Sequence, residues 1–540
     1  MRKISVILVI AALSTGAVWA QWSGNNGDQI ICWDDNLQCW YAKAAVDGEG
    51  VVHAVWAEKV VSYPTQQEIH YSRSSDNGRN WSAINQDIVI SWDDGVNVEN
   101  SNSLAIDSQD NIYVVWAEDD NGANEIHYTI SSDGGDTWTG QQDDMYLSFR
   151  GGADAYNPEM AIDGNDVIHV VWNQDYDDVI DEIYYSRSED GGLTWTSQTE
   201  ERIISFPDGQ YASYPVIAAG PNDELYVVYK EKRDILDDRW VLNVSISTDG
   251  GETWSGAGED IPIINDFHIA SYPHIAVDAN GIVHVNFQGV PELPIHYECY
   301  YTRSDDGGTT WTGLTADRMI SYPGAGDISI HNPNIGVDNS GAVFAVWNEN
   351  YVGTDDAEPH ISISTDGGVS WTGETEDVIV SNPGDYPGYR PFIAAGPDDT
   401  LHVVWNERAA GSYYQIHYSR GDAVSQAPGA DVTITVDPVN PPIIIPAGGG
   451  NFDYTITITN NEAAAVTFDV WLDVMLPGGT VYGPIIFRPD LNLPAGGSIV
   501  RTMTQVIPEG APTGGYQFQG HVGQYPGQVW AEDAFGFVKE

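Results

Sequence analysis

The chain has 540 residues, of which 79 are acidic and 21 are basic, so its formal net charge is −58. This charge repels polyanions at long range and argues against nucleic acid or an anionic membrane as a partner. A hydrophobic content of 42%, with 19 tryptophans and 29 tyrosines, excludes a disordered acidic chain, because these residues can bury a large core.

The first 20 residues, MRKISVILVIAALSTGAVWA, predict a secretory signal peptide that is cut after Ala20. Two basic residues precede an apolar run from Ile4 to Leu13, which is too short to span a bilayer, and no later apolar run is long enough. We therefore expect a secreted protein, extracellular or at the cell surface, with no membrane span. Export permits a bridge between Cys32 and Cys39, whose state the sequence leaves open.

Two strings repeat along the next 400 or so residues. An octapeptide, SSDGGDTW in its Ser131 copy, occurs six times at spacings of 57, 57, 59, 57 and 60 residues, beginning at Ser74, Ser131, Ser188, Ser247, Ser304 and Ser364. A second string, such as PEMAIDGNDVIHVVW from Pro158, occurs seven times. Each unit predicts four short strands, because alternating β-branched residues are separated by turn clusters. Such a unit is typical of a propeller blade.

The seventh octapeptide is missing. The last third strand, Gln415–Arg420, is followed by GDAVSQAPGAD and then by a different pattern. The segment Asp28–Trp33 matches the fourth-strand pattern and has no blade before it. We therefore expect this N-terminal strand to complete the last blade and close the ring, which removes exposed sheet edges.

From about Ala427, five runs of period-two alternation separated by Gly and Pro turns predict an immunoglobulin-like β-sandwich. The predicted fold class is thus all-β: a seven-bladed β-propeller closed by the N-terminal strand, followed by this sandwich. The predicted domains are 1–20 (signal peptide), 21–425 (propeller) and 426–540 (sandwich).

The octapeptide is interpreted as a turn, since an Asp side chain can accept backbone N–H bonds, a Gly pair permits positive φ, and a Trp can pack between sheets. S-x-D-x-G-x-T-W resembles the Asp-box, or bacterial neuraminidase repeat, of sialidase-like propellers, over roughly residues 21–422. The resemblance implies that the boxes lie away from the active site. Asp-boxes also occur in xyloglucan-cleaving enzymes, sorting receptors and non-enzymatic propellers, so the resemblance does not choose a function.

The opposite end of each unit carries recurring carboxylates and aromatic residues. Carboxylates or an amide follow the second strand and precede the third, as at Glu58 and Glu68; they either hold the sheets together or line a site for sugars or cations. Aromatic rings suit carbohydrate, and the candidate ligand-binding residues are Tyr389, Tyr413, Tyr414, Tyr214 and Tyr272. The repeated histidines share a position with Phe344 and are interpreted as packing residues. No full twelve-residue calcium loop is present, so no cofactor is expected, and calcium is left open without a motif that supports it.

Sialidases, as a family, hold the substrate carboxylate with three arginines, use a Tyr paired with a Glu as nucleophile, and use an Asp as acid/base. The nearest match is Tyr389-Arg390-Pro391-Phe392, followed by Asn406-Glu407-Arg408, but the next loop, AAGSYY, lacks the expected Asp. The candidate catalytic residues implied by the resemblance are Arg390, Glu407, Arg408 and Arg150.

The sequence favours a secreted, monomeric propeller that recognises a glycan or a cell-surface protein without catalysis. The alternative is a glycoside hydrolase of the exo-sialidase type. Because the net charge disfavours an anionic sugar, we expect a neutral or cationic glycan as the ligand.

Overall fold

The structure is a computed structural model. It describes residues 22–23, 29–32, 37–59, 66–82, 88–92, 96–120, 122–141, 145–148, 153–176, 180–198, 202–232, 239–265, 267–290, 297–316, 318–321, 328–351, 357–374, 378–381, 387–408, 413–421, 432–462, 464–477, 481–524 and 528–540. The described residues fall into two compact units, one within 20–425 and the other within 426–540. The predicted signal peptide lies outside them. No helix in the described ranges has the length and apolar character needed to cross a membrane.

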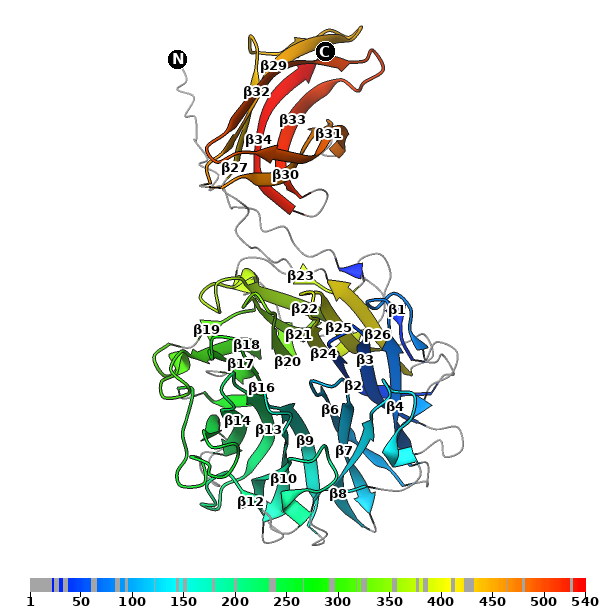
Figure 1. Cartoon of the computed structure of the whole chain (residues 1–540), viewed down its shortest axis with the longest axis vertical. Helices are drawn as coiled ribbons and strands as arrows, with labels where there is room; N and C mark the ends of the chain where they lie inside the picture. The colour runs from blue at the N-terminus through cyan, green and yellow to red at the C-terminus, as the bar shows by residue number, and fades with distance from the viewer. Residues whose placement is uncertain are drawn as a thin grey trace. The chain divides into compact units, whose positions relative to one another are not determined.

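The first unit consists of small antiparallel sheets, seven of them in its described part (Figure 1). They are numbered here in chain order. Sheet 1 contains β2 (Cys39–Val46), β3 (Val52–Lys59), β4 (Gln67–Ser74) and β5 (Ile88–Val89), and sheet 2 contains β6 (Val98–Ile106), β7 (Ile112–Asp120) and β8 (Ala123–Ser131). Sheet 3 contains β9 (Ala155–Ile162), β10 (Ile168–Tyr176), β11 (Ile180–Ser188) and β12 (Arg202–Ile203). Sheet 4 contains β13 (Ala212–Ala219), β14 (Leu225–Lys232) and β15 (Trp240–Ser247).

Sheet 5 contains β16 (Ile269–Val277), β17 (Val283–Val290), β18 (Glu298–Ser304) and β19 (Arg318–Met319). Sheet 6 contains β20 (Ile328–Val337), β21 (Val343–Tyr351), β22 (Ala357–Ser364) and β23 (Val378–Ile379). Sheet 7 contains β24 (Gly388–Ala395), β25 (Leu401–Arg408), β26 (Tyr414–Gly421) and β1 (Gln29–Ile30). Short 3₁₀ turns follow four of the octapeptides: η3 (Thr139–Gln141), η4 (Thr196–Gln198), η5 (Thr312–Leu314) and η6 (Thr372–Glu374). In each sheet the second strand is almost wholly buried, which explains its near-continuous apolar sequence.

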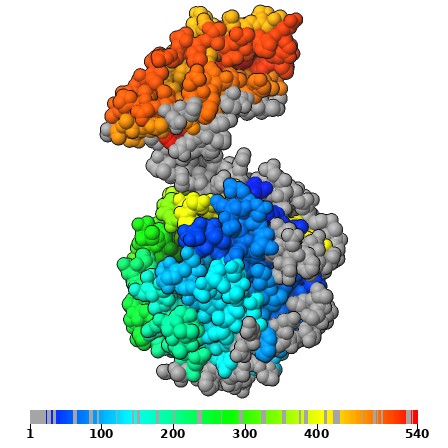
Figure 2. All heavy atoms as spheres, turned by 45° about the vertical axis from the view of Figure 1, so that its right-hand side comes forward, coloured from blue at the N-terminus to red at the C-terminus, as the bar shows by residue number. Residues whose placement is uncertain are grey.

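The first strands of the sheets contact one another in succession: β2 contacts β6, then come β9, β13, β16, β20 and β24, and β24 contacts β2 again. Figure 2 shows the same closure, since yellow residues of the last repeat lie against blue residues of the first. In sheet 1, Cys39 pairs with Glu58 and Val46 pairs with Val52. The strands therefore define two ends of the ring: a mouth, where each first strand begins, and a box end, which carries the octapeptides.

The two chain ends of the first unit meet in sheet 7. Strand β1 pairs with β26 through Gln29–Tyr418 and Ile30–His417, close to the predicted Asp28–Trp33 segment. Sequence reasoning missed a second piece of this junction. Trp22 is buried beside Phe344 and Ile363 of sheet 6, and the Arg420 amide donates to Ser23 Oγ at 2.8 Å.

Trp22-Ser23 therefore stands where the other repeats have the last Trp of the octapeptide and the next hydroxyl residue. In the first copy, the Arg73 amide donates to Ser82 Oγ at 3.0 Å, one residue after Trp81. The signal was present in the sequence, because Trp22 precedes Gln29 by the same interval that separates Trp81 from Ile88. The N-terminus thus supplies the end of the missing seventh octapeptide as well as a fourth strand.

The octapeptide is a self-contained turn. Asp249 accepts hydrogen bonds from Ser247 Oγ at 2.8 Å and from Thr253 through its amide at 2.8 Å and its hydroxyl at 2.6 Å. These donors, with the Thr253 hydroxyl foremost, lower the pKa of Asp249 to about 2. Gly251 has φ of 86°, and a Cβ there would lie 1.9 Å from the Tyr185 hydroxyl oxygen. The turn therefore requires glycine at that position.

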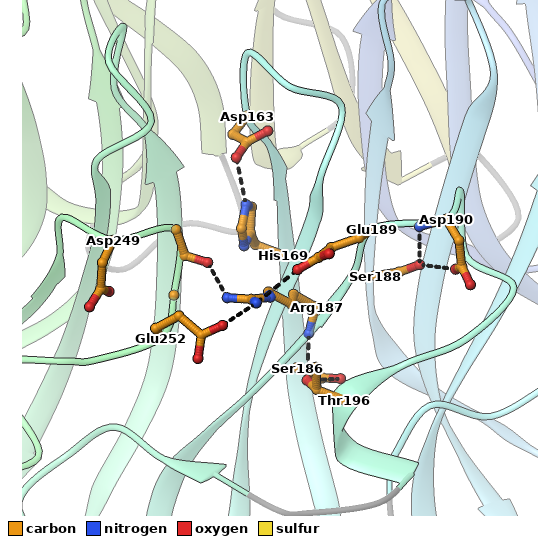
Figure 3. A network of polar contacts seen from close by, with 12 residues as sticks. Asp163, His169, Ser186, Arg187, Ser188, Glu189, Asp190, Thr196, Asp249 and Glu252 are labelled. Carbon is orange, nitrogen blue, oxygen red and sulfur yellow. Dashed lines mark hydrogen bonds and ion pairs between the residues drawn. The ribbon is translucent and has the colours of Figure 1, made fainter.

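Each box also joins its own sheet to the sheet before it. Trp254 packs edge-on against Tyr185 of sheet 3, with ring centroids 4.9 Å apart. Figure 3 shows the charged part of this junction: Arg187 donates to Glu252 Oε1 at 2.5 Å, and His169 Nε2 lies 3.3 Å from Asp163 Oδ2. The same Tyr–Trp contact recurs at Trp138, Trp371 and, across the ring closure, Trp81 with Tyr418. The boxes are therefore joints between sheets.

The second unit has two facing sheets around one core. One sheet has the order β27 (Val432–Pro438), β29 (Gly450–Asn460), β32 (Ser498–Ile507), and the other has the order β28 (Ile444–Ile445), β34 (Gln528–Lys539), β33 (Gly514–Gln524), β30 (Val466–Met475), β31 (Val481–Leu493). Burial alternates along β27 and β29, as the period-two sequence pattern predicts.

Candidate binding site at the mouth of the ring

A bulge interrupts the first strand of every sheet near the mouth, where the register shifts, for example between Trp40 and Lys43. In six sheets the bulge places a non-glycine residue in the left-handed region, with φ between 50° and 58°: Tyr41, Asn157, Tyr214, Tyr272, Asn332 and Arg390. Bulges re-aim side chains, and left-handed backbone costs free energy for residues other than glycine. This ring of bulges turns a set of polar and aromatic side chains toward one common point.

That point is a cavity of about 140 Å³ at the mouth. Residues of all seven first strands line it, including the bulge residues Tyr41, Tyr214, Tyr272 and Arg390. Three of the predicted site residues, Arg390, Tyr214 and Tyr272, are therefore brought together, although they come from sheets 7, 4 and 5.

The upper wall of the cavity is aromatic and cationic. The Arg390 guanidinium carbon lies 3.8 Å from the Tyr41 ring centroid, and the Tyr214 and Tyr272 rings meet edge to face at 5.1 Å. Burial, with smaller effects of the neighbouring Tyr272 and Tyr41 hydroxyls, raises the pKa of Tyr214 to about 12. Burial likewise raises the pKa of Tyr41, against the opposing effect of Arg390. These hydroxyls are neutral donors at physiological pH.

The charged groups deeper in the cavity are paired with one another. Lys43 Nζ lies 2.9 Å from Glu159 Oε1 and 4.5 Å from the centroid of the Phe392 ring, and Ser103 Oγ donates to Glu159 Oε2 at 3.0 Å. Asn334 Nδ2 lies 2.9 Å from His274 Nδ1. Burial, and secondarily Lys43, holds the pKa of His274 well below its usual range, so this imidazole is neutral.

An aromatic cluster extends outward from the cavity over sheet 4; we call Tyr214, Lys230 and Trp240 the sheet-4 flank. Lys230 Nζ lies 4.4 Å from both ring centroids, between the two rings. Burial lowers the pKa of Lys230 to about 8. The ammonium group is thus held by aromatic rings, an arrangement that stabilises a desolvated cation.

A second cluster lies where sheets 7 and 1 meet; we call Trp40, Lys59, Tyr389 and Tyr414 the seam flank. The Tyr414 ring lies 6.0 Å from that of Tyr389 and 6.5 Å from that of Trp40. Lys59 Nζ lies 5.7 Å from the Trp40 ring centroid. Two predicted aromatic residues, Tyr389 and Tyr414, therefore belong to this flank and not to the cavity lining.

The carboxylates after the second strands do not form a rim. Glu407 is buried, accepts from Trp405 Nε1 at 3.0 Å and lies 3.4 Å from His417 Nδ1. Glu58 repeats the arrangement with Trp56 at 2.5 Å. The carboxylates before the third strands accept hydrogen bonds from serines that follow the fourth strands, as from Ser91 to Glu68 at 2.6 Å. These contacts join strands within one sheet, so they stabilise each sheet and do not, as the first of the two interpretations of their pattern had it, join one sheet to the next.

The remaining catalytic candidates do not join the cavity. Glu407 is absent from its lining for the reason given above, and so are Arg408, whose amide donates to the Pro387 carbonyl at 3.0 Å, and Tyr413. Arg150 lies outside the described residues. Within those residues, Arg390 is the one arginine and Glu159 the one carboxylate that line the cavity.

The repeated histidines are packing residues, as their exchange with Phe344 predicts. His402 is buried, with Nδ1 2.8 Å from the Tyr418 hydroxyl, and His53 contacts Tyr71 at 2.7 Å in the same way. No cluster of His, Cys, Asp and Glu able to hold a metal ion occurs among the described residues. Cys32 and Cys39 are both buried and unbridged in the structure.

Sequence reasoning missed the cations of the two flanks. Lys230 follows Tyr229 at a position where sheets 1 and 2 have Ala57 and Ala117, so the exception could have been noticed. The bulge set was also visible, since Tyr214, Tyr272 and Arg390 each precede the repeated proline. The stacking of cations on aromatic rings depends on which strands are neighbours in the fold, so no pattern along the sequence predicts it.

Residues 32–285 match the family model described as BNR repeat-like domain. No curated protein sequence matches the chain. Among solved structures, a PL25 ulvan lyase bound to -[GlcA(1-4)Rha3S]- matches with a TM-score of 0.50 and 14% identity, covering 75% of this chain and 96% of that one. An alpha-L-arabinanase of Penicillium chrysogenum matches with a TM-score of 0.43 and 13% identity, covering 73% and 97%. An alpha-L-arabinofuranosidase of Fusarium graminearum matches with a TM-score of 0.41 and 14% identity, covering 73% and 96%.

At these identities the likeness to the ulvan lyase supports the fold alone. The repeated octapeptides, the ring of small sheets and the matched family model agree with one another. The first unit is therefore an all-β propeller in which residues 32–285 match a BNR repeat-like model.

Proposed function

We propose that the propeller recognises a glycan at the mouth of the ring and does not cleave it. The observation that carries this proposal is the cavity wall, where Arg390 on Tyr41 and the Tyr214–Tyr272 pair present rings, a cation and hydroxyls together. Sugar rings offer C–H faces to aromatic side chains and hydroxyls to polar ones, so this combination suits carbohydrate.

The absence of catalysis is argued from the acids in the described cavity lining. Hydrolysis of a glycoside ordinarily uses a pair of carboxyl groups on either side of the scissile bond. Glu159 is the one carboxylate in that lining, and it is bound to Lys43 and Ser103. A sialidase would also need two arginines besides Arg390, and the described lining offers none. These features support recognition over the exo-sialidase alternative.

The finer architecture belongs to the same proposal. The seven sheets would be the seven blades of one propeller, residues 21–425, closed by the N-terminal strand, and residues 426–540 would be an immunoglobulin-like domain. Removal of residues 1–20 would deliver a soluble monomer to the cell surface or its surroundings. The order of sheet contacts around the ring and the pairing of β1 with β26 support the closure.

A glycan array followed by calorimetric titration tests the function. The full mature chain should bind at least one glycan, and Arg390→Ala should weaken that binding at an unchanged melting temperature. Arg318→Ala is the matched control, because Arg318 Nε donates to Glu374 Oε1 at 2.8 Å on β19, outside the cavity lining. A featureless array would contradict glycan recognition and leave a protein partner as the better hypothesis.

The sialidase alternative has its own measurement. We expect no turnover of a fluorogenic sialoside by the purified chain. Turnover that disappears in Arg390→Ala while the fold survives would establish hydrolysis and overturn the non-catalytic proposal.

A further inference from the structure

We propose that the mouth binds an internal stretch of a linear acidic polysaccharide, of the uronate class, which lies across the ring from the seam flank, over the cavity, to the sheet-4 flank. This inference rests on the proposed glycan recognition and adds the charge of the ligand and the way it lies. It replaces the neutral or cationic glycan that the net charge alone favours.

The two flanks lie far apart around the ring. In the cyclic order of first strands, sheet 4 is separated from the junction of sheets 7 and 1 by three sheets on either side. The sheet-4 flank and the seam flank therefore lie across the ring from each other, with the cavity between them. Figure 1 shows this, since β13 and β14 lie opposite β2 and β24. A ligand that fills the cavity and touches both flanks must extend in both directions.

The flanks and the cavity wall carry positive charge. Lys59, Lys230 and Arg390 lie along this line, and each cation stands over an aromatic ring. Within the described part of the chain none of the three forms an ion pair, in contrast to Lys43, which is bound to Glu159. The chain has only 21 basic residues, so three uncompensated cations on one line are a concentration of positive charge in an acidic protein.

The remote negative charge does not cancel this line. At physiological ionic strength the Debye length is about 8 Å, so exposed carboxylates farther away are largely screened. Cations held close to a bound sugar carboxylate interact through charge-assisted hydrogen bonds, which are stronger than neutral ones. The charge of the glycan that binds is therefore determined by these local cations and not by the net charge of the chain.

The aromatic rings of the two flanks are partly exposed. Trp40, Tyr389, Tyr414, Tyr214 and Trp240 are all half-buried, so part of each ring remains accessible. Each flank carries an indole and at least one phenol, which offer stacking surfaces to successive sugars. Two similar flanks on opposite sides of one cavity suit a chain bound along its length, whereas a terminal sugar would need the cavity and at most one flank.

The experiment compares polygalacturonate and alginate with their carboxyl-reduced forms, which keep the backbone and lose the charge. We expect the acidic polymers to bind, and their affinity to fall as NaCl is raised. Lys59→Gln, Lys230→Gln and Arg390→Gln should each weaken binding by about tenfold, the scale for loss of one charge-assisted hydrogen bond. Arg318→Gln is the control, and the melting temperature of every variant checks the fold.

Chain length tests the way the ligand lies. Longer uronate oligomers should bind more tightly than the disaccharide, and Trp40→Ala and Trp240→Ala should both reduce that gain. If the carboxyl-reduced polymers bind equally well, or a single terminal sugar competes fully, this inference is wrong while glycan recognition stands. If only one flank affects binding of the long oligomers, the crossing path is wrong. If no glycan of any kind binds, the proposed function and this inference both fail.

Discussion

The two ends of the propeller contain similar residue types in different states. At the box end, Arg187 is bound to Glu252, and Asp249 accepts hydrogen bonds from its own turn, so the charged groups there are compensated locally. At the mouth, three cations in the described residues rest on aromatic rings without a carboxylate. Left-handed backbone at residues other than glycine does not distinguish the ends, since Arg390 has it at the mouth and Asp166 has it at the box end. These charged groups at the box end therefore have partners within the chain, whereas the three cations at the mouth form no ion pair among the described residues.

This difference separates stability from recognition. Groups that are already satisfied gain nothing from a ligand, whereas a cation without an anionic partner can gain charge-assisted hydrogen bonds from an acidic one. Substitutions at the box end should therefore change the free energy of unfolding, and substitutions at the mouth should change affinity. The following predictions test that separation, from the largest expected effect to the smallest.

Trp254→Ala should have the largest effect. It removes the ring that packs on Tyr185 between sheets 3 and 4, and loss of a buried Trp costs about 3–5 kcal/mol. Thermal and urea unfolding measure the effect. Trp240→Ala is the matched control at the mouth, where the half-buried ring should affect stability far less and affect glycan binding far more. Equal destabilisation by both variants would contradict the separation.

Arg390→Ala should weaken glycan binding by about tenfold, or about 1.4 kcal/mol, because it removes the one arginine of the described cavity lining. The melting temperature should stay within about a degree or two of the unchanged chain, since Arg390 is half-buried at the mouth, forms no ion pair among the described residues, and substitutions away from the core usually alter stability by less than about 0.5 kcal/mol. Titration calorimetry and differential scanning calorimetry measure the two quantities. A large fall in melting temperature with unchanged affinity would show that Arg390 belongs to the scaffold.

Asp133→Ala should lower the free energy of unfolding by about 1 kcal/mol, the low end for lost turn hydrogen bonds, because the exposed turn lets water replace the carboxylate. Glycan binding by the folded chain should not change.

The same carboxylate gives a test by pH. The Thr137 hydroxyl and amide hold the pKa of Asp133 at about 2, below the value of about 3.9 in an unfolded chain. The contribution of this carboxylate to the free energy of unfolding is therefore present above about pH 4 and is lost as the pH falls toward 2. Asp133→Ala should show a smaller loss of stability over this interval than the unchanged chain.

The smallest effect concerns Lys230. Burial lowers its pKa to about 8, so its positive charge is complete below that pH and is lost as the pH rises through it. Affinity for an acidic glycan should therefore fall a few-fold between about pH 7 and 9, which is the size of change expected when one desolvated cation loses its charge. Lys230→Met should bind more weakly at pH 7 and should lack this decline. A decline of the same size in the variant would assign it to another group.

The sequence predicted the scaffold better than the site. The boxes, the strand order and the packing role of His402 follow from short patterns that repeat at fixed spacing, because each copy makes the same local contacts. The site is an exception to that repetition: the position held by Arg390 is Asn332 in sheet 6 and Tyr272 in sheet 5. The cavity forms where residues of all seven first strands converge, which no single repeat records.

The sandwich illustrates the same limit. Alternation along Val432–Pro438 predicted strands with one buried side, and the structure has them. The parallel pairing of Ile444 with Val538 joins residues far apart in the chain, and no local pattern could have given it.

The shared seventh box also determines the order of folding. Ser23 and Arg420, which are bonded in the finished ring, are separated by 397 positions, so their contact closes a loop that spans almost the whole first unit and costs more entropy than the contacts between successive sheets. During synthesis the segment around Trp22 emerges first, but its partners in sheets 6 and 7 emerge last. The boxes of sheets 2 to 6 join sheets that are neighbours in sequence and can form as the chain lengthens. The box of sheet 1, which joins sheet 7 through Trp81 and Tyr418, and the box made from the two ends both need sheet 7. These two joints therefore form after the others, and until β1 pairs with it, β26 keeps an unpaired edge.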